Sequence, residues 1–125
     1  ISNSTDATPQ GGKICIRTYL IKEGVKVVSD NRSFISIEIS VTGCGIEEEN
    51  LNKIFDPFFT TKKPGEGTGL GLAITRNIVR EYGGDIEVKS AAGKGTTFII
   101  RFPITGSLVG AIHELPLQTP QILEP

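Results

Sequence analysis

Apolar residues occupy every second position from Ile35 to Val41, and this alternation limits the chain to folds that contain a half-buried sheet. The segment runs directly into a glycine-rich turn at residues 42–45. Residues 14–20 show the same alternation after a turn signal at 9–12. We therefore predict two β-strands, each with one face that must be covered by another part of the chain.

Two further segments carry the period of amphipathic helices. The first begins at the acidic run 47–49, whose charges suit the positive end of a helix dipole. Its apolar face would comprise Leu51, Ile54 and Phe55. The second helix would begin at residue 70 and end at a glycine pair, with apolar residues at positions 70, 73, 74, 78 and 82.

The last predicted element is a β-hairpin over residues 86–102, with a turn at 91–95 and a stop at Pro103. Helices among hairpin-type strands predict an α+β fold, a two-layer α/β sandwich with helices on one face of a mixed, mostly antiparallel sheet. We expect residues 1–104 to form this domain, truncated at its N-terminus. Residues 105–125 contain three prolines and no clean period, so they are predicted to be a tail or linker.

Composition excludes several classes of function. With 22% charged residues and a net charge of −1, the chain lacks the basic excess of a nucleic-acid-binding protein. No apolar run approaches the roughly 20 residues needed to span a bilayer, so we expect no membrane contact by this fragment. Cys15 and Cys44 have no paired metal spacing, which favours reduced thiols and a cytoplasmic location, although the full-length protein could be membrane-anchored.

Two glycine-rich segments, 43–45 and 65–71, are the candidate binding elements. Glycines permit close backbone approach, and the second segment opens a helix whose free N–H groups can hold phosphates. The second segment matches neither the P-loop nor the dinucleotide-binding spacing, and taken alone it could equally be a flexible loop. The preceding stretch, 55–69, has two prolines and three glycines, and loops of this length are usually functional.

The order of five segments resembles the histidine-kinase branch of the GHKL ATPase superfamily, which has the Bergerat fold. Residues 3–12 are similar to its asparagine box, 42–46 to its first glycine box and 55–62 to its phenylalanine box. Residues 67–72 are similar to its second glycine box, and 93–98 to the motif before its closing strand. The resemblance implies an ATP-binding catalytic domain of a two-component sensor histidine kinase. Such a domain donates the γ-phosphoryl group of ATP to a histidine on a separate helical dimerisation domain, with a response regulator as an indirect partner.

The resemblance also implies roles for individual residues. Asn3 would bind Mg²⁺ through its side-chain oxygen, or alternatively act as a helix cap. Lys62 would reach a phosphate or remain a solvated lysine. The segment with Gly67, Gly69 and Gly71 would form a lid over the triphosphate, and Phe58 and Phe59 would anchor this lid or form local core. Thr96 would hydrogen-bond near the adenine or simply favour a strand. The implied nucleotide-binding residues are Asn3, Asp6, Val41, Gly43, Gly45, Ile46, Lys62, Gly67, Thr68, Gly69, Leu70, Gly71 and Thr96.

Val41 departs from the family pattern. The first glycine box of the family begins with an aspartate that accepts a hydrogen bond from the adenine amino group, and valine cannot do so. The loss would cost about 1–3 kcal/mol, or up to about 100-fold in affinity. The alternative function is therefore a degenerate or engineered, binding-defective domain that acts as a docking or regulatory module. We expect the phosphoacceptor histidine and its helical hairpin to lie upstream of Ile1. His113 is the only histidine of the chain, and it is expected to be a tail residue because Pro116 would disrupt the helix that a phosphoacceptor needs.

Overall fold

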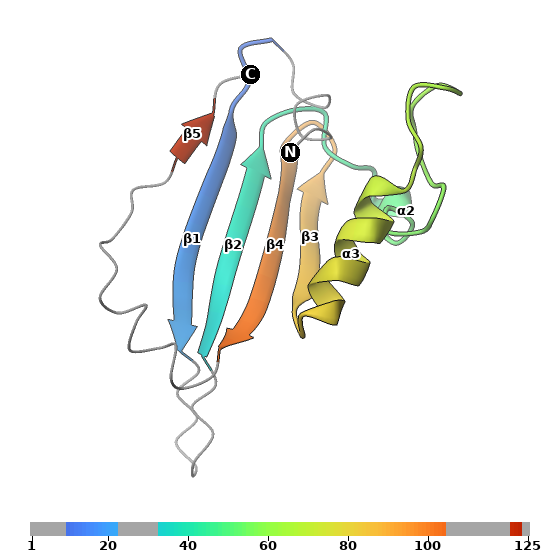
Figure 1. Ribbon diagram of the computed structural model, residues 1–125. Coiled ribbons are helices and arrows are strands. Elements are labelled where there is room, and N and C mark those ends of the chain that lie inside the picture. The colour runs from blue at the N-terminus through green and yellow to red at the C-terminus, as the bar shows by residue number, and fades with distance from the viewer. Residues whose placement is uncertain (1–9, 23–32, 105–120, 124–125) are drawn as a thin grey trace.

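The computed structural model describes residues 10–22, 33–104 and 121–123, which build a five-stranded sheet with the order β3-β4-β2-β1-β5 (Figure 1). All strand pairings within this part of the chain are antiparallel. The prediction of a mostly antiparallel sheet is therefore confirmed, and the described strands include no parallel pair. The strands are β1 (Ile14–Lys22), β2 (Ser33–Val41), β3 (Asp85–Ala91), β4 (Gly95–Ile104) and β5 (Gln121–Leu123).

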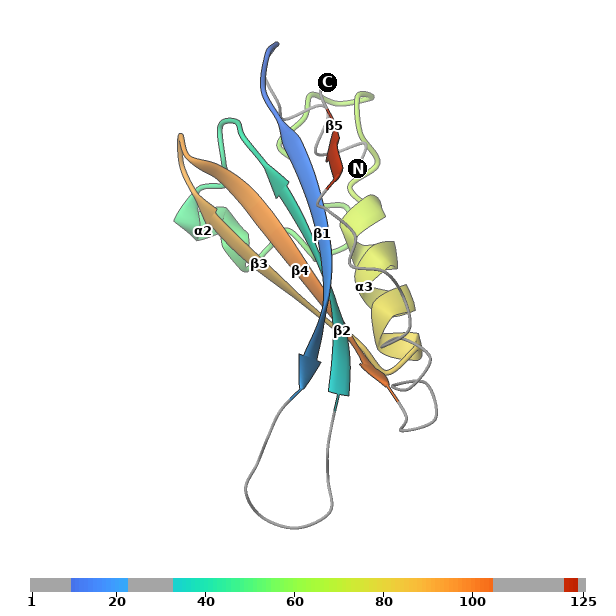
Figure 2. The same ribbon diagram turned by 90° about the vertical axis from the view of Figure 1, so that its left-hand side faces the viewer.

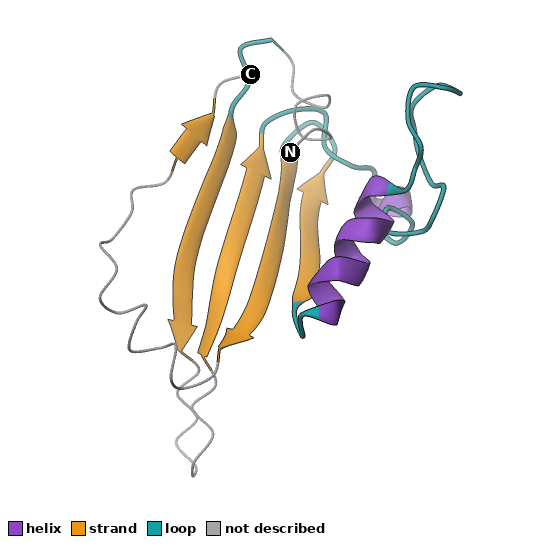
Figure 3. Ribbon diagram, viewed as in Figure 1, coloured by secondary structure: helices purple, strands orange, loops and turns teal. Residues whose placement is uncertain are grey.

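Two helices, α2 (Glu48–Leu51) and α3 (Gly71–Glu81), both contact β3, and the predicted α+β fold is confirmed. Figure 3 shows them beside the β3 end of the sheet, and Figure 2 shows α3 running along the twisted strands. Helix α2 is shorter than predicted, because the chain tightens into turns in which the Asp56 N–H bonds the Lys53 carbonyl. Pro57 disfavours a helical conformation at Asp56 and so prevents continuation. Ile54 is still buried.

The strand register aligns one row of side chains across the sheet. Ile14 pairs with Val41, Val41 with Thr96, and Thr96 with Ser90, so these four residues share one face at the same end of β1, β2, β4 and β3. Ile14, Val41 and Thr96 are all buried. The predicted alternation of residues 35–41 therefore places Val41 where expected, at the end of the covered face.

The apolar face of α3 differs from the prediction. Ala73 is buried, together with Val79, which the pattern of positions 70, 73, 74, 78 and 82 did not include. Ile74, Ile78 and Tyr82 are instead 52%, 50% and 73% exposed. The helix is rotated so that these three side chains point away from the sheet in the described part of the chain.

The end of the predicted tail is part of the sheet. Residues Gln121–Leu123 pair with Ile14, Cys15 and Ile16 at the outer edge of β1, whereas residues 105–120 lie outside the described residues. An edge strand presents unpaired backbone N–H and C=O groups, which explains why a short segment can add to it. Within the described ranges, no helix is both long and apolar enough to cross a membrane.

The face of the sheet opposite that row is mostly polar, although it also carries the buried Ile99. Tyr19 donates a hydrogen bond to Glu38, and the Ser40 and Thr97 hydroxyls lie 3.0 Å apart. Arg101 donates a hydrogen bond of 2.9 Å to the Glu87 carboxylate, and this contact holds the pKa of that carboxyl below its usual range.

We expect Glu87→Gln to lower the free energy of unfolding at neutral pH by less than about 1 kcal/mol, because the pair is partly exposed. A carboxyl whose pKa is lower in the folded state stabilises the protein at pH values above its unfolded-state pKa. This stabilisation is lost as the pH falls through the folded-state pKa. The difference between wild type and variant should therefore shrink as the pH falls from about 7 to about 3. Urea denaturation at several pH values measures it, and a difference independent of pH would contradict the assignment.

Candidate nucleotide site

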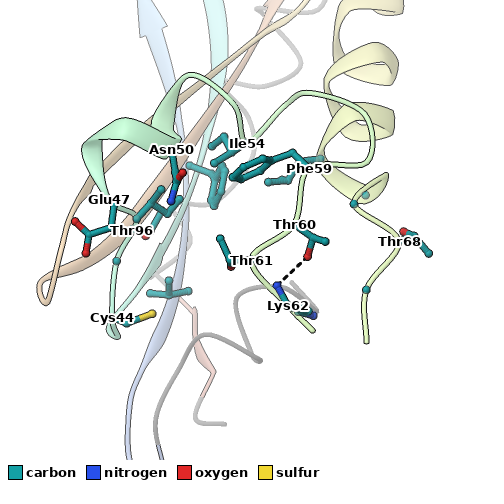
Figure 4. Close-up of a pocket in the computed structure, with 18 residues that line it drawn as sticks. Cys44, Glu47, Asn50, Ile54, Phe59, Thr60, Thr61, Lys62, Thr68 and Thr96 are labelled. Atoms are coloured by element: carbon teal, nitrogen blue, oxygen red, sulfur yellow. Dashed lines mark hydrogen bonds between the residues drawn. The ribbon is translucent and has the colours of Figure 1, made fainter. Parts of the chain in front are cut away.

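A pocket of about 600 Å³ lies where the C-terminal end of β2 meets α2, the loop before α3 and the start of α3 (Figure 4). Of the residues implied as nucleotide-binding, the pocket brings together Val41, Gly45, Ile46, Lys62, Gly67, Thr68, Gly69, Gly71 and Thr96. Gly43 and Leu70 are not among its lining residues. Asn3 and Asp6 lie outside the described residues, so the structure says nothing of their predicted roles.

Several lining residues were missed by the sequence analysis. Glu47, Asn50 and Ile54 come from α2 and the turns on either side of it. Their spacing of three and then four residues is that of one helix face, which is the signal that could have identified them. Figure 4 shows Glu47 and Asn50 near Thr96, so the wall opposite the lid carries a carboxylate and an amide.

The first glycine turn is held against the turn between β3 and β4. Gly45 has a φ of +71°, and a Cβ there would lie 2.2 Å from the carbonyl oxygen of Ala91. The Gly93 N–H also bonds the Cys44 carbonyl at 2.7 Å. Glycine is therefore required at position 45 by packing between two turns, independently of any ligand.

The two ends of the loop from 55 to 70 lie against each other next to the pocket, where Gly69 meets the backbone of Phe58. Phe58 has a φ of +67°, the one positive value at a non-glycine among the described residues, and its side chain is 75% exposed. Gly69 packs on the backbone of Phe58, because a Cβ at Gly69 would lie 2.4 Å from the Phe58 carbonyl carbon. Phe59 lines the pocket instead. The two aromatic residues thus differ, with Phe59 in the site and Phe58 pointing outward.

We expect Gly69→Ala to weaken nucleotide binding by roughly 10-fold or more while changing the sheet's stability little, because the added Cβ must separate the two ends of the loop. Gly65→Ala is the matched control. Gly65 also has a positive φ, of +85°, but a Cβ there meets nothing within 4 Å. Titration with a fluorescent ATP analogue measures the affinity of both variants. Equal affinities of Gly69→Ala and Gly65→Ala would show that the contact between Gly69 and Phe58 does not shape the site.

The start of α3 supplies the positive end of the pocket. Its N-cap, Leu70, makes no side-chain capping hydrogen bond, so the first N–H groups of α3 have no cap partner. Helix N-termini of this kind attract anionic groups. Lys62 lines the same pocket, and its N–H bonds the Thr60 hydroxyl at 3.1 Å.

The described part of the chain has no cluster of His, Cys, Asp or Glu side chains that could hold a metal ion. Mg²⁺ prefers oxygen ligands and usually keeps several waters, so it needs few protein ligands. The predicted ligand, Asn3, lies outside the described residues.

A sheet of antiparallel strands, a glycine turn packed against the β3–β4 turn and a glycine-rich segment that leads into helix α3 define a class of nucleotide-binding α+β domain. Residues 1–106 match the family described as "Histidine kinase-, DNA gyrase B-, and HSP90-like ATPase". The chain belongs to this family.

Curated relatives point to one branch. The chain is 43% identical over 106 residues to the sensor kinase CckA of Brucella abortus, an alignment that covers 81% of the chain and 11% of the relative. It is 48% identical over 85 residues to the sensor histidine kinase ZraS of Escherichia coli, covering 66% of the chain and 18% of the relative. The chain therefore matches less than a fifth of either kinase.

Solved structures agree. The mycobacterial sensor histidine kinase MprB has a TM-score of 0.64 and 30% identity, with 81% of this chain and 62% of that chain covered. The catalytic domain of histidine kinase ThkA, in a nucleotide-free form, has a TM-score of 0.60 and 33% identity, with 82% and 58% covered. The chain is thus similar to sensor histidine kinases in sequence, and in structure to a sensor histidine kinase and to the catalytic domain of a histidine kinase.

Proposed function

We propose that this chain is the ATP-binding catalytic domain of a two-component sensor histidine kinase. In the whole protein, the γ-phosphoryl group of ATP would pass to a histidine on a separate helical dimerisation domain, and a response regulator would act downstream. The observation that carries the proposal is a pocket that joins the sheet end at Val41 and Thr96 to the glycines of the loop before α3 and to the start of α3.

The pocket has two chemically different ends, which match the two ends of ATP. The sheet end is lined by the apolar side chains of Val41, Ile54 and Phe98, with the polar side chains of Thr96, Glu47 and Asn50 close by. An apolar surface with a few polar groups is suited to a flat base. The other end holds the N-terminus of α3 and Lys62, which are suited to the triphosphate. Positioning and charge neutralisation are the main contributions a protein makes to phosphoryl transfer.

Magnesium is part of the proposal through the resemblance alone. Mg²⁺ would neutralise charge on the phosphates, and Asn3 would offer it a side-chain oxygen. We place the domain in the cytoplasm, where ATP and response regulators are available.

The test is a titration of the chain with a fluorescent ATP analogue, with and without Mg²⁺, combined with labelling of the whole protein by γ-labelled ATP. We expect binding that unlabelled ATP displaces and that Mg²⁺ strengthens, and an acid-labile phosphorylated residue in the whole protein. Labelling that persists after the lid glycines are replaced would contradict the assignment of the pocket.

A docking or regulatory module is the second candidate, favoured by Val41 at the position where the family has aspartate. This function needs the fold and its surfaces but no nucleotide. It gains support if neither the native chain nor its Val41→Asp variant binds the analogue.

A further inference from the structure

We propose that Ser90 is a positioning residue that turns the Thr96 hydroxyl into a hydrogen-bond acceptor, and that the pocket thereby selects a purine nucleotide with an amino group on its base. This inference rests on the proposed function, since it requires a nucleotide in the pocket. It assigns base selection to a neutral hydroxyl in a chain whose position 41 cannot provide it.

The strand register places the three residues concerned side by side. Val41, Thr96 and Ser90 are successive cross-strand partners on β2, β4 and β3, so their side chains share one face. Val41 and Thr96 line the pocket and are only 7% and 8% exposed. Ser90 does not line it, so any effect of Ser90 on a ligand must act through Thr96.

The hydrogen bonds of Ser90 determine which way the Thr96 hydroxyl points. The Ser90 Oγ lies 2.8 Å from the Ile46 N–H, 2.8 Å from the Gly95 carbonyl oxygen and 2.7 Å from the Thr96 Oγ1. The Ile46 N–H can only donate and the Gly95 carbonyl can only accept. A serine hydroxyl has one hydrogen and two acceptor sites.

All three contacts are satisfied together in only one arrangement. Ser90 gives its hydrogen to the Gly95 carbonyl and accepts from the Ile46 N–H, so Thr96 must donate to Ser90. The Thr96 hydrogen is then in use, and its remaining oxygen lone pairs can only accept. A buried acceptor favours a base that brings a donor, and an exocyclic amino group is such a donor.

The absence of a carboxylate at position 41 gives this hydroxyl its importance, although the Glu47 carboxylate and the Asn50 amide also line the pocket near Thr96. Val41 offers no acceptor, and its cross-strand neighbours on this face are Ile14 and Thr96. Among these three residues, the Thr96 oxygen is the one side-chain acceptor. A neutral hydroxyl makes a weaker bond than a carboxylate, so we expect selection to be real but modest.

The experiment compares displacement of a fluorescent ATP analogue by ATP and by purine riboside triphosphate, which lacks only the amino group. We expect ATP to bind about 3- to 10-fold more tightly to the native chain. Thr96→Val and Ser90→Ala should each bring this ratio close to 1, because they remove the acceptor or release the hydroxyl to donate. Ser90→Thr keeps a hydroxyl and should restore the ratio.

Ser40→Ala is the matched control. Its hydroxyl also pairs with a threonine hydroxyl between β2 and β4, at 3.0 Å from that of Thr97, but this pair is on the opposite face of the sheet. The variant should leave the ratio unchanged. A merely structural role for Ser90 would weaken both nucleotides equally and would not change the ratio.

The outcomes separate the two proposals. Equal affinity of the native chain for both triphosphates, or an unchanged ratio in Ser90→Ala, overturns the assignment of Ser90 and Thr96 while the proposed function stands. Failure of the native chain to bind either triphosphate overturns the proposed function, and the base selection with it.

Discussion

Val41→Asp is expected to bind ATP about 10- to 100-fold more tightly than the native chain. Val41 lines the pocket next to Thr96, and an aspartate there would accept a hydrogen bond from the base amino group. A hydrogen bond to a charged acceptor contributes about 1.5–3 kcal/mol, which corresponds to this gain in affinity. Titration with the fluorescent ATP analogue measures it directly.

The same substitution should make the free protein less stable. Val41 is 7% exposed and pairs with the apolar Ile14, so a carboxylate at this position loses most of its contact with water. We expect a lower urea midpoint without nucleotide and partial recovery of that midpoint when ATP is added.

Val41→Asn separates hydrogen bonding from charge, because its amide oxygen is a neutral acceptor of similar size. We expect it to recover part of the gain in ATP affinity. If the native chain and Val41→Asp bind ATP equally well, position 41 does not contact the base and the weak-binding argument is wrong.

Gly95→Ala is expected to lower the free energy of unfolding by about 2–5 kcal/mol, through backbone strain and overpacking. Gly95 is buried with a φ of +100°, and a Cβ there would lie 2.2 Å from the Val41 carbonyl oxygen. Strands β2 and β4, which contribute Val41 and Thr96 to the pocket, would have to move apart. Urea denaturation followed by circular dichroism gives the free energy.

Gly93→Ala isolates the contribution of close packing. Gly93 lies in the same turn with a φ of +76°, but a Cβ there meets nothing within 4 Å. We expect it to cost about 1–2 kcal/mol, the cost of a left-handed conformation for alanine. Equal destabilisation by the two variants would show that the approach of Gly95 to Val41 contributes nothing.

Local pattern predicted much of the fold because it depends only on neighbouring residues. The alternation in residues 35–41 specified a strand with one covered face, and the glycine pair at 83–84 specified the end of α3. The exposed flank of α3 was not predictable in this way, since a helical period shows which residues share a face but not which way that face turns.

The candidate site was likewise predictable in part from the sequence and in part only from the tertiary structure. By itself, the sequence determined the order of the glycine-rich segments and the valine at position 41, and through their resemblance to a family, a nucleotide pocket. Only the tertiary structure decided that Phe59 and not Phe58 lines the pocket, and that Ser90 contacts Thr96. The physical reason is that hydrogen-bond partners are set by tertiary packing. Ser90 meets Ile46, 44 residues away in sequence, and pairs with Thr96 across β3 and β4, and neither contact can be seen in a local pattern.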